Sequence, residues 1–233
     1  MGLWRLDTTF NIIDILILAV ELIGAVLVII TLREDKKVKQ AEFIMNYNFH
    51  FISSKPLVEM ERKLENCYQI YNDYTKRQEK YSEIQNEMVK EIDLKRVTEN
   101  KERVTSEYQE LINYLVYLES LAPLILTKQI DLKDIDDTFG YRYFIAMNNP
   151  VVQEYELLQE ADYYCGCIKV YETWYKFRKK NGKSIPMEAF ALSNTDGENM
   201  NPVYKACQRE ESLVEKYKRI TAKKINGVKR SDR

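Results

Sequence analysis

Carboxyl groups recur every seven residues within an apolar stretch near the N-terminus. Asp7, Asp14 and Glu21 share this spacing, which keeps them close to one face of an α-helix. At 100° per residue, an arc of about 80° holds the whole stripe, which consists of Asp7, Asn11, Asp14, Leu18, Glu21 and Ala25. A carboxylate costs at least about 2.5 kcal/mol at the centre of a membrane helix, so such residues usually face a bundle interior or a water-filled path. We therefore expect these six residues to line a cation-favouring pore in a homo-oligomer.

Three other interpretations of this acidic stripe stay open. The carboxyl groups could pair with a basic residue of a different membrane protein, or they could be protonated in a helix bundle that conducts nothing. The segment could also never span the bilayer. Replacing Asp14 and Glu21 separates a pore from an inert anchor, because only a pore depends on their charge.

A second group of residues suited to chemistry is basic and lies among aromatic side chains further along the chain. Cations beside aromatic rings are able to hold the phosphates and stacked bases of a nucleotide or oligonucleotide. The candidate ligand-binding residues are Trp174, Lys176, Arg178, Lys179, Lys180 and Lys183. The alternative is a helix C-terminus whose dipole is stabilised by positive charge.

The sequence gives no signal for catalysis or for a bound metal. It contains one histidine, His50, and it has no glycine-rich phosphate loop and no Gly-x-Ser-x-Gly motif. The Cys165-Gly166-Cys167 pair is too closely spaced for a usual zinc half-site. We expect structural or incidental thiols in a reducing compartment, no catalytic residue, no metal and no cofactor, and therefore not an enzyme.

The apolar stretch itself, residues 10–32, predicts a transmembrane helix. Its length of about 35 Å exceeds a hydrocarbon core of about 30 Å, and no small-residue cleavage site of a signal peptide follows it. One basic residue, Arg5, precedes the stretch, whereas four follow it closely: Arg33, Lys36, Lys37 and Lys39. This excess of basic residues after the apolar stretch predicts a single-pass protein of the cell inner membrane, with the N-terminus outside and the C-terminus in the cytoplasm.

The remaining elements predict an all-α fold. Glycine and proline number only 7 and 5 among 233 residues, and no alternating strand pattern occurs. We expect helices over 57–81, 105–128 (kinked near Pro123), 131–147, 150–180 and 203–225, with 76–103 as an exposed or loosely held segment and 184–201 as a loop. The predicted domains are an external N-terminus (1–9), the transmembrane helix (10–32), a juxtamembrane helix (33–55), a cytosolic helical domain (56–225) and a basic tail (226–233).

One part of the chain resembles a known family. The stretch 114–157 reads YLVYLESLAPLILTKQIDLKDIDDTFGYRYFIAMNNPVVQEYEL. It is similar to an uncharacterised bacterial family that pairs one N-terminal membrane helix with a helical cytosolic domain. The layout also resembles the membrane effectors of anti-phage defence systems, including the Hailong channel effector. This resemblance implies an oligomeric ion channel in the lipid bilayer that a cytosolic nucleotide or oligonucleotide opens, depolarising the membrane in abortive infection. The alternative is a non-conducting membrane-anchored scaffold that recruits a protein partner.

Overall fold

The computed structural model describes residues 12–77, 81–92, 106–193 and 200–207, with side chains in the first helix from Val20 onward. Every regular element within these ranges is a helix, and no strand occurs in them. The predicted all-α fold is therefore confirmed. The chain divides into two units, residues 1–47 and 48–233, and each is described by itself below.

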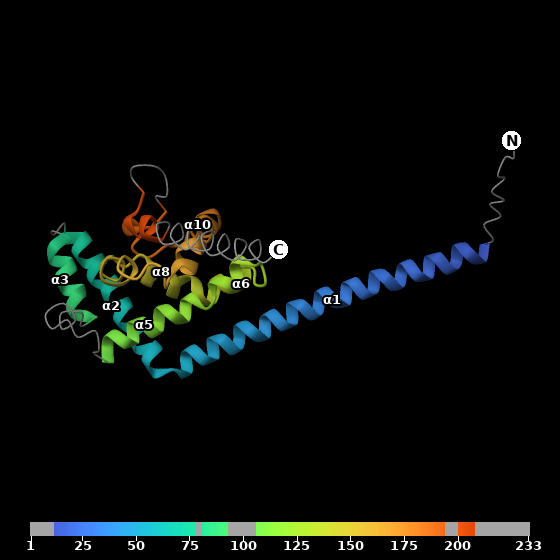
Figure 1. The fold of residues 1–233 in the computed structure, drawn as a ribbon, viewed down its shortest axis with the longest axis horizontal. Coiled ribbons are helices and arrows are strands. Elements are labelled where there is room, and N and C mark those ends of the chain that lie inside the picture. Colours follow the sequence, from blue (N-terminus) through green and yellow to red (C-terminus); the bar gives the residue numbers. More distant parts are fainter. Residues whose placement is uncertain (1–11, 78–80, 93–105, 194–199, 208–233) are drawn as a thin grey trace, which may run out of the picture. The chain divides into compact units, whose positions relative to one another are not determined.

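The first unit consists of most of helix α1, which runs unbroken from Ile12 to Ser53 (Figure 1). No proline or glycine occurs from Ala25 to Ser54, which favours such continuity. The helix ends at Ser53, directly before the Ser54-Lys55-Pro56 sequence. Among the side chains that the structure describes, no helix combines the length and the apolar character needed to cross a membrane. The predicted span 10–32 begins outside that part, since side chains are described only from Val20.

The second unit starts with an amphipathic helix that organises the others. Helix α2 (Lys55–Arg77) buries Leu57, Met60, Leu64 and Cys67 and packs against helices α3 (Tyr81–Glu91) and α5 (Ser106–Glu119). The sequence predicted α2 well, because its apolar residues recur every three or four positions. The sequence did not predict that α3 would be packed, yet its residues Ile84, Met88 and Val89 are buried, as is Ile92 directly after it. The predicted loosely held segment is thus packed in the part that the structure describes.

The central helix predicted for 105–128 is two helices. Helix α5 ends at Glu119, and the short helix α6 (Ala122–Leu126) carries Pro123 in its first turn. Proline is tolerated there because the first N–H groups of a helix have no intrahelical partner. The chain therefore breaks before Pro123 instead of kinking at it.

The next predicted helix, 131–147, forms as a run of three segments. These are α7 (Leu132–Ile135), the π-helix η1 (Asp136–Gly140) and α8 (Tyr141–Met147). Asp131 occupies the N-cap position, but its side chain makes no capping hydrogen bond. The Phe139-Gly140-Tyr141 sequence lies where the π-helix passes into α8.

The prediction of a single long helix over 150–180 is wrong. Asn149 does cap a helix start by accepting from the N–H groups of Val151 and Val152. The helix nevertheless ends after α9 (Pro150–Val152) and the π-helix η2 (Gln153–Leu157), and turns lead into α10 (Cys165–Lys180). A short 3-10 helix, η3 (Glu188–Phe190), lies in the predicted loop, and residues 202–207 are helical. The rest of the predicted helix 203–225 and the basic tail lie outside the described residues.

The core explains the abundance of tyrosine, of which the chain has 17. Tyr114, Tyr143 and Tyr171 are almost fully buried. Each phenol donates a hydrogen bond, to Arg142 O at 3.1 Å, Cys167 O at 2.6 Å and Asn148 Oδ1 at 2.5 Å, respectively. A buried tyrosine needs such a partner. These bonds join α5, α8 and α10 at fixed positions, so they set the framework for the polar groups considered next.

Candidate functional site

The acidic stripe lies on α1, and the structure describes part of it. Glu21 and Ala25 have exposed side chains. Asp14 and Leu18 lie in the same helix, but their side chains are not among those described, and Asp7 and Asn11 lie outside the described residues. Helical spacing places 14, 18, 21 and 25 on one face of α1. The pore-lining role of the stripe remains a prediction.

Apolar side chains surround Glu21 on α1. From Val20 to Leu32 they are between 45% and 69% exposed, and they point in all directions around the helix axis. A helix that is apolar on every side is normally buried in protein or in a membrane. Within the described part of this unit, α1 is the only element.

Three lysines of the predicted ligand-binding cluster, Lys176, Lys179 and Lys183, have acidic partners. Lys176 Nζ lies 2.8 Å from Glu172 Oε1, and Lys179 Nζ lies 2.8 Å from Glu188 Oε1. Lys183 pairs with Asp136 and Asp137. Its ammonium holds the pKa of Asp137 below the ordinary value, and Lys179 does the same for Glu188. Lys180 is exposed at the end of α10.

The other two residues of that cluster are buried around one carboxylate. Asp136 is 1% exposed and accepts hydrogen bonds from Trp174 Nε1 at 2.6 Å and Arg178 Nη1 at 3.1 Å. Arg178 also donates to Ser184 O through Nη2 at 2.9 Å. The indole of Trp174 stacks on Tyr143 with ring centroids 4.5 Å apart, so it is not available to stack on a base.

The π-helix η1 brings Asp136 to this position. Gly140 is required four residues further on, because a Cβ there would collide with the guanidinium of Arg178 and the carboxylate of Asp136. Short π-helical segments are rare, and they often mark functional sites. Here the segment joins α8 to α10 through a satisfied buried ion pair.

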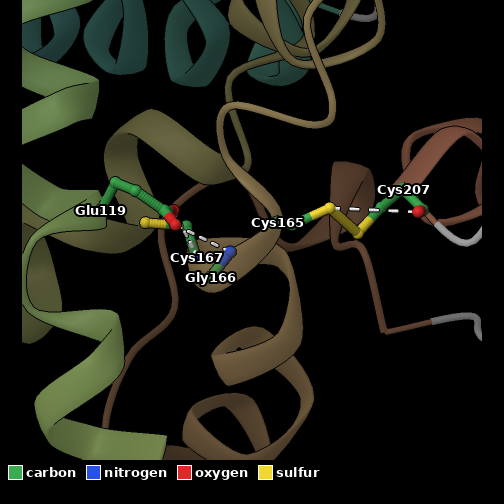
Figure 2. The surroundings of a disulfide bond; sticks show 5 residues. All are labelled: Glu119, Cys165, Gly166, Cys167 and Cys207. Carbon is green, nitrogen blue, oxygen red and sulfur yellow. Dashed lines mark hydrogen bonds between the residues drawn. A yellow bond between two sulfur atoms is a disulfide. The ribbon is translucent and has the colours of Figure 1, made fainter. Parts of the chain in front are cut away.

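Glu119, at the end of α5, caps the N-terminus of α10 (Figure 2). Its two carboxylate oxygens accept from the N–H groups of Gly166 at 2.9 Å and Cys167 at 2.7 Å. These are among the first N–H groups of the helix, which have no intrahelical partner and attract negative charge. Burial raises the pKa of Glu119, although both backbone hydrogen bonds act to lower it. Gly166 permits the close approach, since a Cβ would collide with this carboxylate and with Ala122.

A disulfide links the start of α10 to the helical residues 202–207. Cys165 bonds to Cys207 (Figure 2), with the two Cα atoms 5.7 Å apart. Cys67 and Cys167 are free and buried. Burial raises the pKa of the Cys67 thiol to about 12 and that of Cys167 well above its ordinary value, so neither is a ready nucleophile. The expectation of thiols is therefore wrong for Cys165 and Cys207, because spacing alone does not show which cysteines meet in the fold.

A second buried carboxylate lies on the other π-helix, η2. Glu156 is 2% exposed and accepts hydrogen bonds from the phenols of Tyr108 and Tyr164. A pocket of about 290 Å³ opens beside it. Sequence reasoning missed Asp136 and Glu156 as buried acids and Glu119 as a half-buried one, since their neighbours in the sequence resemble those of any solvated acidic residue.

Comparison with known proteins assigns the chain to no family. No protein-family model matches the chain, and no curated protein and no solved structure matches it either. The resemblance of residues 114–157 to a membrane-protein family therefore remains a prediction. Any functional conclusion has to come from the geometry and charge described above.

Proposed function

We propose that this chain is a single-pass membrane protein whose N-terminal helices associate into a homo-oligomeric, cation-permeable channel controlled by its helical C-terminal unit. The observation that carries this proposal is α1, which presents apolar side chains on all sides from Val20 to Leu32 with Glu21 among them. Exposed apolar surface of this extent is a mark of contact with lipid or with another protein.

The apolar surface argues for insertion of α1. Burial of apolar area is worth about 25 cal/mol per Å², so this run would not stay in water while lipid is near. The residues predicted to complete the span, 10–19, continue the same apolar composition in the sequence. Together they would provide the length of about 20 residues that a bilayer requires.

The acidic stripe argues for association of several copies. A single helix would leave Glu21 and Asp14 facing hydrocarbon, which is unfavourable, whereas a ring of helices places them around a shared polar axis.

The control we propose is a nucleotide or oligonucleotide signal acting on the C-terminal unit. Phosphate groups would exchange with Glu188, the partner of Lys179, and with Asp137, the exposed partner of Lys183, while Lys176 and Lys180 would add positive charge at the surface. Exposed ion pairs are worth only about 0–1 kcal/mol, so such an exchange costs little. Trp174 and Arg178 would act as the rigid support behind this surface, because both are buried.

The proposal places this unit in the cytoplasm of a bacterium, as part of an anti-phage defence that depolarises the inner membrane. Four basic residues follow the apolar run and one precedes it, which favours that orientation. Disulfides persist mainly in oxidising compartments. In this orientation the bond between Cys165 and Cys207 would therefore form only when the cytoplasm is oxidised.

The experiment is a measurement of membrane potential in cells that express the chain. Wild type should depolarise the membrane, and the double variant Asp14→Ala/Glu21→Ala should not, at equal membrane levels. Glu34→Ala is the matched control, because it removes a carboxylate from the opposite face of α1 and should leave depolarisation unchanged.

Two results would decide against a channel lined by the acidic stripe. No depolarisation by wild type under any condition, phage challenge included, would leave a non-conducting anchored scaffold that recruits a partner. Equal depolarisation by wild type and the double variant would remove the acidic stripe from the conducting path.

A further inference from the structure

The last turn of α1 is built into the C-terminal unit. That unit begins at Asn48, and α1 continues to Ser53. Within this turn Phe51 is fully buried. Its ring meets that of Tyr114 edge to face with centroids 5.7 Å apart, and it lies 5.4 Å from the ring of Tyr117. A helix is a rigid element, so this turn is the part of α1 on which the C-terminal unit acts directly.

Arg142, on α8, holds this turn by two contacts. Its Nη1 donates a hydrogen bond to Asn48 Oδ1 at 2.7 Å, and its guanidinium lies 4.2 Å from the ring centroid of Phe51. Residues three positions apart share one face of a helix, so both contacts are made to the same side of α1. The guanidinium also donates through Nε to Glu61 Oε1 at 2.8 Å, and the side chain of Arg142 is only 17% exposed. One residue therefore joins α8 to both α1 and α2.

The hydrogen bond from Arg142 restricts the turn in a way that apolar packing alone does not. Burial of apolar surface is non-directional, so a helix held only through Phe51 is able to rotate or slide. A hydrogen bond to Asn48 requires a particular distance and angle, and a charged donor makes it stronger than a bond between neutral groups. Arg142 therefore fixes the rotation of the last turn of α1.

The π-helix η1 supports the guanidinium of Arg142 from the other side. Nη1 also donates to the carbonyl oxygen of Thr138 at 3.4 Å, and the guanidinium lies 5.5 Å from the ring centroid of Phe139. Asp137, directly before Thr138, pairs with Lys183 of the basic surface. The same short segment thus contacts the basic surface and the residue that holds α1, and π-helical segments often lie at functional sites.

We propose that Arg142 is the positioning residue through which the C-terminal unit controls α1. Lys183, in the turn after α10, links that turn to η1 through Asp136 and Asp137. A phosphate that replaces Asp137 on Lys183 would remove one of these two links, and the change would reach Arg142 through the carbonyl of Thr138. This inference rests on the proposed function, since it names the residue through which the control proposed there passes.

Hydrogen exchange of the full-length protein in detergent micelles, read by mass spectrometry, tests the hold on α1. Asn48→Ala removes the acceptor on α1 and leaves Arg142 its partner on α2. The amides of residues 49–53 should then exchange about tenfold faster, since a hydrogen bond to a charged group contributes at least that factor. Arg142→Met should give the same increase or a larger one. Arg62→Met removes an exposed arginine that pairs within α2, and it should leave exchange at 49–53 unchanged.

Two lysines of the basic surface test the route from the ligand site. Lys183→Met breaks the ion pairs with η1 and should speed exchange at residues 49–53 about threefold, within the usual range for coupling between two sites. Lys179→Met breaks the pair with Glu188, which lies outside η1, and should leave exchange at 49–53 unchanged. Each rate is compared with that of the amides of α5, which report any loss of stability in the whole unit.

Membrane potential separates this inference from the proposed channel. If the channel forms, Asn48→Ala should abolish the difference in depolarisation between phage-challenged and unchallenged cells, whereas Arg62→Met should keep it. If wild type never depolarises the membrane, the proposed channel fails, and the exchange rates still decide whether Arg142 holds α1.

The inference is overturned if Asn48→Ala and Arg142→Met leave exchange at residues 49–53 unchanged relative to α5, because apolar packing alone would then hold the turn. It is also overturned if Lys183→Met and Lys179→Met have equal effects, since the coupling would then not pass through η1. If Arg142→Met does not fold, Asn48→Ala decides, because that side chain is half-buried and its loss leaves Arg142 paired.

Discussion

Breaking the bond between Cys165 and Cys207 should lower the free energy of unfolding of the C-terminal unit by up to about 4 kcal/mol. The two residues are 42 positions apart, and the chain-entropy relation for a closed loop of that length gives this value at 25 °C. The loss is large beside the 5–15 kcal/mol that stabilises a typical domain. The bond acts mainly by restricting the unfolded chain, so the folded structure of α10 should change little on reduction.

Urea unfolding followed by tryptophan fluorescence measures this loss. Trp174 is fully buried, and a Trp4→Phe background leaves it as the single reporter, since the chain has two tryptophans. With a slope of about 2 kcal/mol per M, reduction should lower the midpoint by about 2 M. Cys165→Ser should match reduced wild type and respond to no reductant. An unchanged midpoint on reduction would refute the reasoning, because it would mean that the bond does not restrict the unfolded chain.

Two further predictions concern the half-buried carboxylate of Glu119 and the buried one of Asp136, and urea unfolding measures both. Burial raises the pKa of Glu119 above 4.5, so the folded state holds this proton more tightly than the unfolded chain, and this residue's contribution to stability falls as pH rises through the raised pKa. Glu119→Gln should remove that slope, and an identical pH profile for the two proteins would contradict the assignment. Arg178→Met should cost about 3 kcal/mol, because it removes one partner of buried Asp136. Lys179→Met breaks an exposed pair with Glu188 and should cost less than about 1 kcal/mol; equal costs would show that burial of the pair does not matter.

The local sequence pattern was enough to predict several features of the fold. The absence of glycine and proline over most of its length, together with the Ser54-Lys55-Pro56 sequence, predicted that α1 would continue unbroken and end where it does. The spacing of Leu57, Met60 and Leu64 predicted α2 and its buried face. Gly182, with a φ of 64°, follows α10 where the Asn181-Gly182 sequence predicted its end, because glycine adopts this conformation without strain. In each case the controlling interactions lie within a few residues of one another.

Tertiary contacts determined where the chain leaves the helix before α10, which the local sequence pattern could not predict. No proline and no glycine lies between Val151 and Cys165, so nothing nearby in sequence signals that the chain leaves the helix there. The break is stabilised from a distance: Glu119 caps the new helix at Gly166 and Cys167.

The same division applies to the candidate sites. The acidic stripe on α1 follows from sequence alone, since helical periodicity fixes which residues share a face. The basic cluster near the end of α10 was also visible in sequence, but only the fold shows that Asp136 and Glu188 are its partners. The pocket beside Glu156 is a product of packing between η2 and α5. Such a site depends on residues about 50 positions apart meeting in space, and that meeting is determined by the whole core and not by any local pattern.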